Sequence, residues 1–295
     1  MKKIIIGVDL GGTKIMAGAI DMAGKVQGTP MKIPTESYLP KEIILKKITD
    51  AIEKIINDLT LTISNVEGIG IGSTGPLDIE TGVILECPQL PTMKFFPLRD
   101  AVQTYFGIPV FLNNDANCLI LGECIFGVAA HKKNVVGFTL GTGIGCGIVM
   151  DKKIWTGSTG TAGEIWTSPY KSGIIEDYIS GAGISKIYQV IAGNDKSSLE
   201  IYKMAENGDM NALRAWAVFG THLAVPLAWS INILDPEVVV LGGSIIAAYK
   251  FFKNTMEDNL QKRICPVPAE KTKVELAQLG DYAGFIGAAC LVLEN

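Results

Sequence analysis

The chain has 295 residues, enough for one large domain or two domains of medium size. Apolar residues make up 48% of it and supply ample material for a core. The formal net charge is -4 and the lysines are scattered, which argues against a general nucleic-acid binder, because phosphate backbones require clustered Lys and Arg.

The N-terminal segment does not match a secretory signal, because the apolar run after Lys3 is short and ends at Asp9. No segment approaches the roughly 18 uninterrupted apolar residues that a membrane span needs. The six cysteines are widely spaced, with no CxxC or CxC pair, so we expect free thiols in a reducing compartment. These features predict a cytoplasmic protein without a membrane partner.

The first third of the chain alternates apolar strands with turns. Residues 2–12 and 66–75 each predict a strand that runs into glycines, and residues 15–26 predict a hairpin around a DMAG turn. Residues 41–59 predict an amphipathic helix, because isoleucines recur there at steps of three and four. Residues 108–127 predict a strand that ends in polar residues, followed by a helix.

A second unit over residues 134–157 repeats this layout as strand, glycine turn, strand and a further strand. The segments IIIGVDLGGTK and VVGFTLGTGIG both lead from an apolar strand into Leu-Gly and then Gly and Thr, which predicts two related halves. Residues 174–229 are predicted to be mostly helical, with Pro226 at a kink or a helix start. Residues 236–245 predict a strand buried in a mixed or parallel sheet, and residues 282–295 a terminal helix.

Glycine turns follow four of the predicted strands. Glycines expose backbone N–H groups that can cradle phosphate oxygens, and four such turns together predict a cleft shared by two halves. The P-loop pattern does not fit, because Thr13 precedes Lys14, and GTGIGCG lacks the GxGxxG spacing. The alternative is that the glycines only permit tight bends. The four turns are Gly11-Gly12, Gly72 to Gly75, Gly141 to Gly145, and Gly242-Gly243.

Asp9 lies at the tip of the first strand, beside the first glycine turn. A carboxylate there is suited to hold Mg²⁺, directly or through water, and the alternative is an Asp that caps the turn. Thr13 and Thr142 can donate hydroxyl hydrogens to phosphate oxygens. Lys14 either adds positive charge to this site or is solvated.

The sequence Asn113-Asn114-Asp115 ends a strand and precedes a helix. Asn and Asp commonly cap helices at this position. The same set also suits a polyol, because amides bind hydroxyls and a carboxylate can accept the proton of an attacking hydroxyl. Glu164 and Glu176, in glycine-flanked loops, are either ordinary surface acids or, with Asp115, ligands around a sugar.

Neither histidine belongs to a catalytic motif. His131 adjoins two lysines and is expected at the surface, whereas His222 lies in an apolar helical run and is expected in the core or on the helix surface. The sequence contains no GxSxG, HExxH or Cys/His constellation.

Seven motifs, in this order, make the chain resemble the ROK family of bacterial sugar kinases, which are glucokinase-like members of the superfamily of sugar kinases, heat-shock ATPases and actin. The resemblance covers essentially the whole length. The motifs are GVDLGGTK, GIGSTGPLD, NNDANCLILGE, LGTGIGCGIV, GTAGEI, IEDYISG and DPEVVVLGGS.

The resemblance implies an α/β fold with two actin-like (ribonuclease H-like) domains and an interdomain cleft for nucleotide and sugar. The small domain would comprise residues 1–116 plus 281–295, and the large domain residues 117–280. The implied activity is ATP-dependent phosphorylation of a hexose or N-acetylhexosamine at the 6-hydroxyl, in a homodimer with no nucleic-acid partner.

The resemblance also implies roles for individual residues. Asp115 would be the general base, and Asp9 would lie near Mg²⁺, acting through water. The residues implied in nucleotide binding are Asp9, Gly11, Gly12, Thr13, Lys14, Gly141, Thr142, Gly143, Gly145, Gly242 and Gly243. The residues implied in sugar binding are Gly75, Pro76, Gln89, Asn114, Asp115, Glu164 and Glu176.

Two departures from the family pattern lie on the sugar side. Many members carry a His soon after the Glu of GEI and then a CxCGxxGCxE zinc segment. Here Trp166 takes the histidine position, and SPYKSGII (168–175) has no cysteine, so we expect no zinc site and a loop held by packing. Trp166 either covers the sugar or fills the missing site. Gln89 stands where the family has the Asn of an Asn-Leu-Pro segment.

Two other functions stay open within the family. Sugar-responsive transcriptional regulators carry an added N-terminal DNA-binding head, and we expect no room for one before the strand that starts at Ile4. A non-catalytic sugar or nucleotide sensor would fit the altered zinc segment and Gln89. The presence of Asp9, Asp115 and the glycine turns argues against a sensor.

Overall fold

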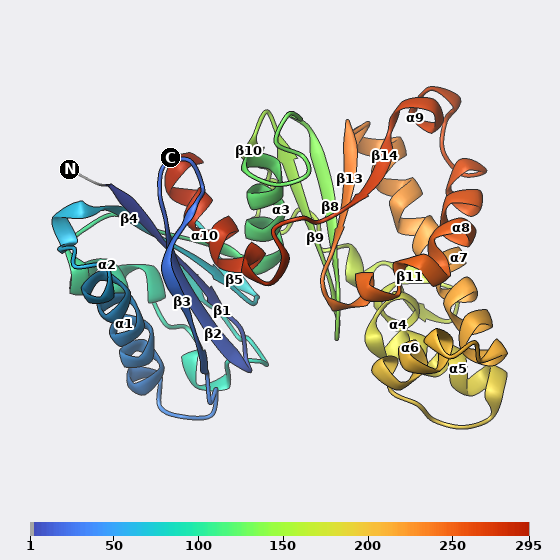
Figure 1. Cartoon of the computed structure of the whole chain (residues 1–295), viewed down its shortest axis with the longest axis horizontal. Helices are drawn as coiled ribbons and strands as arrows, with labels where there is room; N and C mark the ends of the chain where they lie inside the picture. The colour runs from blue at the N-terminus through green and yellow to red at the C-terminus, as the bar shows by residue number, and fades with distance from the viewer. Residues whose placement is uncertain (1–2, 295) are drawn as a thin grey trace. The chain divides into compact units, whose positions relative to one another are not determined.

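The computed structural model describes residues 3–294, which form a mixed α/β structure (Figure 1). The chain divides into two compact units. Unit 1 comprises the described residues of Met1–Lys133, Gly147–Ala162 and Ala277–Asn295, and unit 2 comprises Asn134–Cys146 and Gly163–Leu276. The domain boundaries inferred from the sequence stay a prediction.

The first sheet has the strand order β3-β2-β1-β4-β7 and lies in unit 1. The strands β1 (Ile4–Leu10), β2 (Lys14–Ile20) and β3 (Val26–Pro34) form an antiparallel meander. The strands β4 (Val66–Ser73) and β7 (Val110–Asn114) extend the sheet in parallel with β1. The predicted strands and the hairpin are therefore confirmed, and the carboxyl ends of β1, β4 and β7 share one edge.

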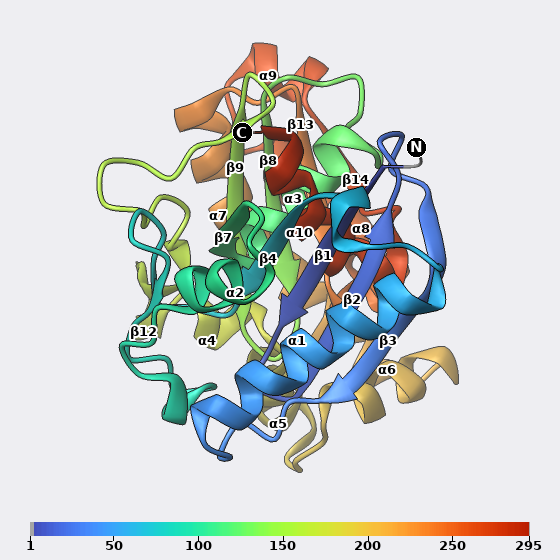
Figure 2. The same ribbon diagram turned by 90° about the vertical axis from the view of Figure 1, so that its left-hand side faces the viewer.

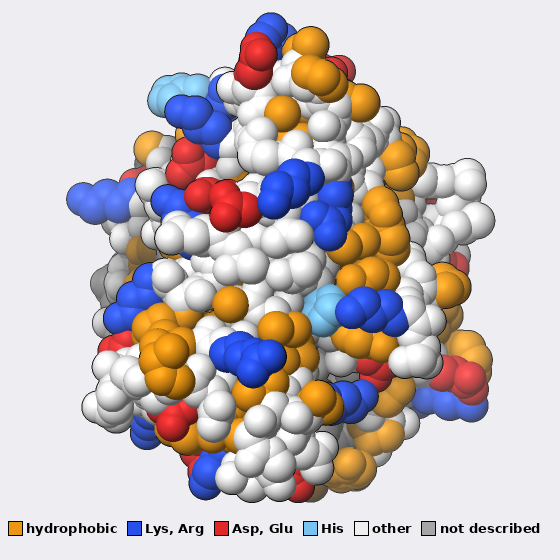
Figure 3. Space-filling model, turned by 90° about the vertical axis from the view of Figure 1, so that its right-hand side faces the viewer, with side chains coloured by type: hydrophobic (Ala, Val, Ile, Leu, Met, Phe, Trp, Pro, Cys, Tyr) orange, Lys and Arg blue, Asp and Glu red, His pale blue; other side chains and the backbone are white. Residues whose placement is uncertain are grey.

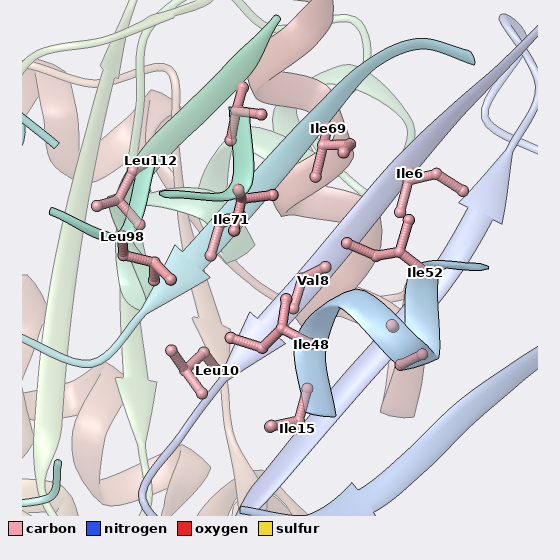
Figure 4. Packing of buried hydrophobic residues seen from close by; sticks show 14 of the residues in the cluster. Ile6, Val8, Leu10, Ile15, Ile48, Ile52, Ile69, Ile71, Leu98 and Leu112 are labelled. Carbon is pink, nitrogen blue, oxygen red and sulfur yellow. The ribbon is translucent and has the colours of Figure 1, made fainter. Parts of the chain in front are cut away.

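Helix α1 (Lys41–Asp58) lies along one face of this sheet, as Figure 2 shows. Its isoleucines pack onto the alternate side chains of β1 that point to the same face, among them Ile6 and Val8 (Figure 4). Each fully buried isoleucine stabilises the fold by about 2 kcal/mol. The predicted amphipathic helix is confirmed. The unit also contains α2 (Leu98–Phe106) and α3 (Asp115–Ile125).

The terminal helix α10 (Ala283–Glu294) packs on the other face of the sheet. Glycines of β1 and β4 have no side chains there, so the helix backbone can approach the strands closely. A Cβ at Gly7 would overlap the carbonyl of Phe285, and a Cβ at Gly70 would overlap the carbonyl of Ala288. Gly287 of α10 lies equally close to the backbone of α3. Backbone contacts of this kind fix the position of α10 against β1, β4 and α3.

The second sheet has the order β10-β9-β8-β13-β14. Its strands repeat the layout of the first sheet, with β13 parallel to both β8 and β14. The parallel strand predicted at residues 236–245 is therefore confirmed. The strands are β8 (Val135–Leu140), β9 (Ile144–Met150), β10 (Lys153–Ile154), β13 (Val238–Gly242) and β14 (Lys273–Leu276).

The internal similarity extends to the strand register. Asp9 of β1 lies opposite Gly72 of β4, and Thr139 of β8 lies opposite Gly242 of β13. The two Leu-Gly motifs therefore occupy equivalent positions in the two sheets. The predicted relation between the halves is confirmed, with Thr139 in the place of the carboxylate.

The remaining elements are mostly helices of unit 2, as predicted for residues 174–229. Two short hairpins are also present. One pairs β5 (Leu77–Asp78) with β6 (Val83–Ile84) in unit 1, and the other pairs β11 (Pro169–Tyr170) with β12 (Gly173–Ile174) in unit 2. The helices are α4 (Glu176–Ile179), α5 (Gly181–Ala192), α6 (Ser198–Glu206), α7 (Met210–Leu234), α8 (Tyr249–Gln261) and α9 (Pro266–Lys271). The 3-10 turns are Ile63–Asn65, Pro91–Met93, Ile165–Thr167, Ser244–Ala248 and Gly280–Tyr282.

Helix α7 is the one helix among the described residues that is long and apolar enough to cross a membrane, by length and composition alone. Its most apolar stretch is 56% buried, and buried core helices of soluble proteins meet the same criteria, so this is weak evidence. Trp216 packs against Phe219 and Phe252. The helix starts at Met210, so a helix start at Pro226 is wrong and this proline lies inside the helix.

The surface carries no broad basic stripe on the face that Figure 3 shows. Lys and Arg side chains there are spread over the face and are interspersed with Asp and Glu side chains as well as with hydrophobic and neutral ones. This arrangement matches the scattered lysines of the sequence.

Candidate functional site

Three predicted motifs meet at the carboxyl edge of the first sheet. In the parallel register Leu10 lies opposite Ser73, and Ser73 lies opposite Asn114, so the segments that follow β1, β4 and β7 start side by side. The N–H of Thr74 donates to the carbonyl of Leu10 at 3.2 Å and ties two of these segments together. Ligands of open α/β sheets bind at this edge.

Two hydrogen bonds of Gly11 hold the first glycine turn. The N–H of Gly11 donates to the carbonyl of Lys14 at 3.0 Å, and the Thr35 hydroxyl donates to the carbonyl of Gly11 at 2.6 Å. Within residues 3–294, nothing accepts a hydrogen bond from the N–H of Gly12 or Thr13. The turn therefore offers two backbone donors, as an anion cradle requires. Sequence reasoning missed Thr35, which comes from a different segment.

Asp9 lies beside this turn with a side chain that is 20% exposed, and Lys14 Nζ is 3.9 Å from Asp9 Oδ2. Burial raises the pKa of the Asp9 carboxyl, and Lys14 offsets part of that effect. A Cβ at Gly284 would lie 2.6 Å from Asp9 Oδ2, so the first turn of α10 approaches the carboxylate. Among the residues that the structure describes, no backbone N–H donates to the carboxylate of Asp9, so no hydrogen bond supports the alternative that Asp9 caps the turn.

Strand β7 leads directly into α3, and its last residue, Asn114, is the N-cap of that helix. Asn114 Oδ1 accepts from the N–H of Ala116 at 2.9 Å, and Asp115 Oδ1 accepts from the same N–H at 2.7 Å. The capping alternative is thus confirmed for Asn114. A Cβ at Gly75 would lie 3.4 Å from Asn114 Nδ2, so the Gly75-Pro76 segment lies next to the amide.

The loop that carries Gln89 joins the same cluster. A Cβ at Gly12 would lie 2.7 Å from the carbonyl oxygen of Gln89, and Cys87 Sγ is 3.5 Å from Gln89 Oε1. Burial raises the pKa of the Cys87 thiol, and the charge of Asp115 adds a smaller contribution. Unit 1 therefore brings together the first glycine turn, Gln89 and Asp115, with Cys87 as a neighbour that the sequence did not reveal.

The second glycine turn, in unit 2, is held in a similar way. The N–H of Gly141 donates to the carbonyl of Gly143 at 2.9 Å, and the N–H of Gly181 donates to the carbonyl of Gly141 at 2.8 Å. The N–H groups of Thr142 and Gly143 have no acceptor among the residues that the structure describes. This turn also offers two backbone donors.

The third turn, at the end of β13, lies against the second. Gly243 has a φ of +87°, and a Cβ there would overlap the carbonyl of Leu140. Only glycine combines this backbone conformation with such a close approach. The predicted Gly242-Gly243 and Gly141 segments are thus neighbours in unit 2, and Gly145 lies just beyond the second turn, in β9.

The predicted sugar ligands of unit 2 each have a defined partner. The indole N–H of Trp166 donates to Glu164 Oε2, and Ile144 N–H donates to Glu176 Oε2 at 3.0 Å. Burial raises the pKa of the Cys146 thiol to about 12, with a smaller contribution from the charge of Glu164. Trp166 thus contacts the predicted ligand Glu164 directly.

A hairpin of β11 and β12 occupies the place of the family's zinc segment. Tyr170 Oη lies 3.0 Å from His222 Nδ1, and the ring of Tyr170 makes edge contacts with Tyr178 and Trp229. The prediction that packing holds this loop is confirmed, and the contact between Tyr170 Oη and His222 Nδ1 adds a hydrogen bond. His222 is 6% exposed, in agreement with a core position. The described residues contain no group of three or more His, Cys, Asp and Glu placed to hold a metal.

His222 gives the hairpin a pH dependence that can be measured. Burial, with help from Lys171, lowers the pKa of His222 from 6.5 to about 4. Below pH 6.5 the unfolded chain takes up a proton that the folded protein does not bind, so the free energy of unfolding falls towards pH 4. We expect His222→Gln to lack this contribution. Urea unfolding of both proteins across this window should show their stability difference changing with pH, and parallel curves would contradict the assignment.

Comparison with known proteins gives the same family as the motifs. The sequence profile of the ROK family matches residues 5–295. The chain belongs to the ROK family. An N-acetyl-D-glucosamine kinase of Photobacterium profundum is 31% identical over 311 residues, which cover 98% of this chain and 99% of that protein. A glucokinase of Halalkalibacterium halodurans is 30% identical over 315 residues, which cover 98% of this chain and 95% of that protein.

Solved structures of the ROK family share the fold. The crystal structure of a ROK family glucokinase from Streptomyces griseus in complex with glucose and AMPPNP matches with a TM-score of 0.82 and 26% identity. The match covers 99% of this chain and 100% of that one. The α/β fold class of the actin-like superfamily, predicted from the motifs, is thereby confirmed.

Proposed function

We propose that this protein is an ATP-dependent sugar kinase that phosphorylates a hexose or an N-acetylhexosamine at the 6-hydroxyl. The observation that carries the proposal is in unit 1, where Asp115 lies at the same sheet edge as a turn with two N–H donors that have no acceptor within residues 3–294. Family membership and the kinases among its relatives support ATP and a sugar as the substrates.

The chemistry follows from the residue types. Asp115 accepts the proton of the sugar hydroxyl as its oxygen attacks the γ-phosphorus, and Asn114 holds the sugar. Phosphoryl transfer depends on positioning and on neutralisation of phosphate charge. The other proposed sugar ligands are Gly75, Pro76, Gln89, Glu164 and Glu176. The proposed nucleotide ligands are Asp9, Gly11, Gly12, Thr13, Lys14, Gly141, Thr142, Gly143, Gly145, Gly242 and Gly243.

Asp9 is the proposed partner of Mg²⁺, which would neutralise phosphate charge when it is bound. A lone carboxylate fits this ion, because Mg²⁺ usually keeps several waters and binds through one or two carboxylates plus substrate phosphates. The proposal includes no zinc site. We further propose that the protein is a cytoplasmic homodimer without nucleic-acid or membrane partners. We also propose a small domain of residues 1–116 plus 281–295 and a large domain of residues 117–280.

An ADP-release assay tests the proposal against glucose, mannose, fructose, allose, N-acetylglucosamine and N-acetylmannosamine. Turnover of at least one of these sugars is expected. Absence of turnover with all of them, together with sugar binding in calorimetry, would instead identify a sensor. Sequence-specific retention of DNA in a gel would favour a regulator.

Trp166→Phe is expected to raise the KM for the sugar about 5-fold and to leave kcat nearly unchanged. The phenyl ring keeps an aromatic side chain, although a smaller one, and lacks the N–H that donates to Glu164. Steady-state kinetics with the best sugar of the panel measures the effect. Trp155→Phe is the matched control, because Trp155 is 45% exposed and belongs to none of the proposed ligand sets. Equal effects of both substitutions would contradict the role of the indole N–H.

A further inference from the structure

Glu176 is attached to the second glycine turn rather than standing free beside it. Its Oε2 accepts from the N–H of Ile144, the residue that ends the turn, at 3.0 Å. A Cβ at Gly143 would lie 2.6 Å from the same oxygen, so the carboxylate lies directly against the turn. Glu176 and Ile144 are 32 positions apart, and this bond closes the segment between them.

The contact with Glu176 uses the N–H of Ile144 and neither of the two donors inside the turn. The Gly181 N–H holds the carbonyl of Gly141 at one end of the turn, and Glu176 holds Ile144 at the other end. Between these two anchors lie the N–H groups of Thr142 and Gly143, which have no acceptor within residues 3–294. A turn fixed at both ends loses less conformational entropy when an anion binds to its donors.

The second oxygen of Glu176 is not engaged in the same way. Oε1 accepts no hydrogen bond from any residue between 3 and 294, and the side chain is only partly buried. A hydroxyl that donates to Oε1 would draw negative charge away from Oε2. It would thereby reduce the repulsion between the carboxylate and a phosphate bound to the neighbouring turn.

We propose that Glu176 is a positioning residue for the second glycine turn, and that it couples the binding of sugar to the affinity for nucleotide. The inference rests on the proposed kinase function and deepens it, because it gives one predicted sugar ligand a role in ATP binding. The coupling is positive: a bound sugar raises the affinity for ATP by about 5- to 10-fold, at the lower end of the usual range for coupled sites.

Calorimetry with Mg-AMPPNP, without sugar and with the sugar that the panel identifies, tests this role. We expect Glu176→Ala to weaken AMPPNP binding about 10-fold without sugar and to abolish the gain from sugar. Glu176→Gln retains an oxygen for Ile144, so its AMPPNP affinity should stay within about 3-fold of the wild type. Glu164→Ala is the matched comparison, because Glu164 accepts from the indole N–H of Trp166 and, among the described residues, forms no hydrogen bond with the turn. It should weaken sugar binding and leave AMPPNP affinity in the absence of sugar unchanged.

Amide hydrogen exchange at Ile144 gives a second readout that needs no catalysis. Exchange should accelerate in Glu176→Ala and stay slow in Glu176→Gln. The inference is overturned if Glu176→Ala binds AMPPNP as the wild type does, if Glu176→Gln is as weak as Glu176→Ala, or if the wild type does not bind AMPPNP. Failure of the kinase proposal is recognised separately, as absence of turnover with every sugar of the panel despite normal AMPPNP binding.

Discussion

Asp115→Asn is expected to lower kcat by about 10²- to 10⁴-fold and to leave the affinity for the sugar within a few-fold of the wild type. General base catalysis typically contributes a factor of this size, and an amide cannot accept the proton of the attacking hydroxyl. The asparagine oxygen can still accept from the N–H of Ala116, so the start of α3 should keep its structure. Steady-state kinetics measures the loss, and calorimetry measures sugar binding.

The matched control for this prediction is Asp100→Asn. Asp100 also lies in the first turn of a helix, α2, but it is exposed and pairs with Arg99 rather than lying at the site. Its replacement should leave kcat unchanged. If Asp115→Asn retained wild-type turnover, the proposed base would be wrong, whereas a similar loss in both variants would indicate a general effect of removing a helix N-terminal charge.

The sequence predicts the parts of this site that arise from local patterns. Strands that end in glycines, and Asn-Asp at a helix start, depend on neighbours within a few positions, so Gly11, Gly141 and Asp115 could be found from spacing alone. The equivalence of Asp9 and Thr139 could be anticipated because both strands use the same Leu-Gly signal. The register then confirmed it.

The partners of these residues could not be found in this way, because they come from distant segments. Thr35 holds the first turn from 24 positions away, and Ile144 holds Glu176 from 32 positions away. Gly284 approaches Asp9 only because α10 packs on β1 through glycines. No local pattern in the chain encodes such tertiary contacts. The sequence also left Trp166 between two roles, and the structure shows a third, a hydrogen bond to Glu164.

The second large effect, on the free energy of unfolding, is expected when Glu123 is replaced. This residue was not singled out from the sequence. Glu123 lies near the end of α3 and is fully buried. Its Oε1 accepts from the N–H groups of Gln278 and Leu279, both at 2.8 Å, and its Oε2 accepts from the N–H of Val128 at 2.9 Å. The carboxylate therefore ties α3, which begins at Asp115, to the segment that leads into α10.

Glu123→Ala is expected to lower the free energy of unfolding by about 2–4 kcal/mol, because three N–H groups lose the carboxylate that accepts their hydrogen bonds and a buried side chain is truncated. Glu123→Gln should fall between the alanine variant and the wild type. Its amide oxygen can accept from the N–H groups of Gln278 and Leu279, but its NH₂ group would then face the N–H of Val128, and two donors cannot bond to each other. Urea unfolding of the full chain measures these differences.

Glu67→Ala provides the comparison for a carboxylate of the same unit that lies at the surface. Glu67 pairs with Lys3 at 2.9 Å, with both side chains more than a third exposed, and such pairs contribute about 0–1 kcal/mol. If Glu123→Ala cost no more than Glu67→Ala, water would have to reach the three N–H groups, and the carboxylate would not be what holds α3 in place. A large loss for Glu123 alone would instead show that Asp115 begins a helix whose far end is fixed by a buried charge.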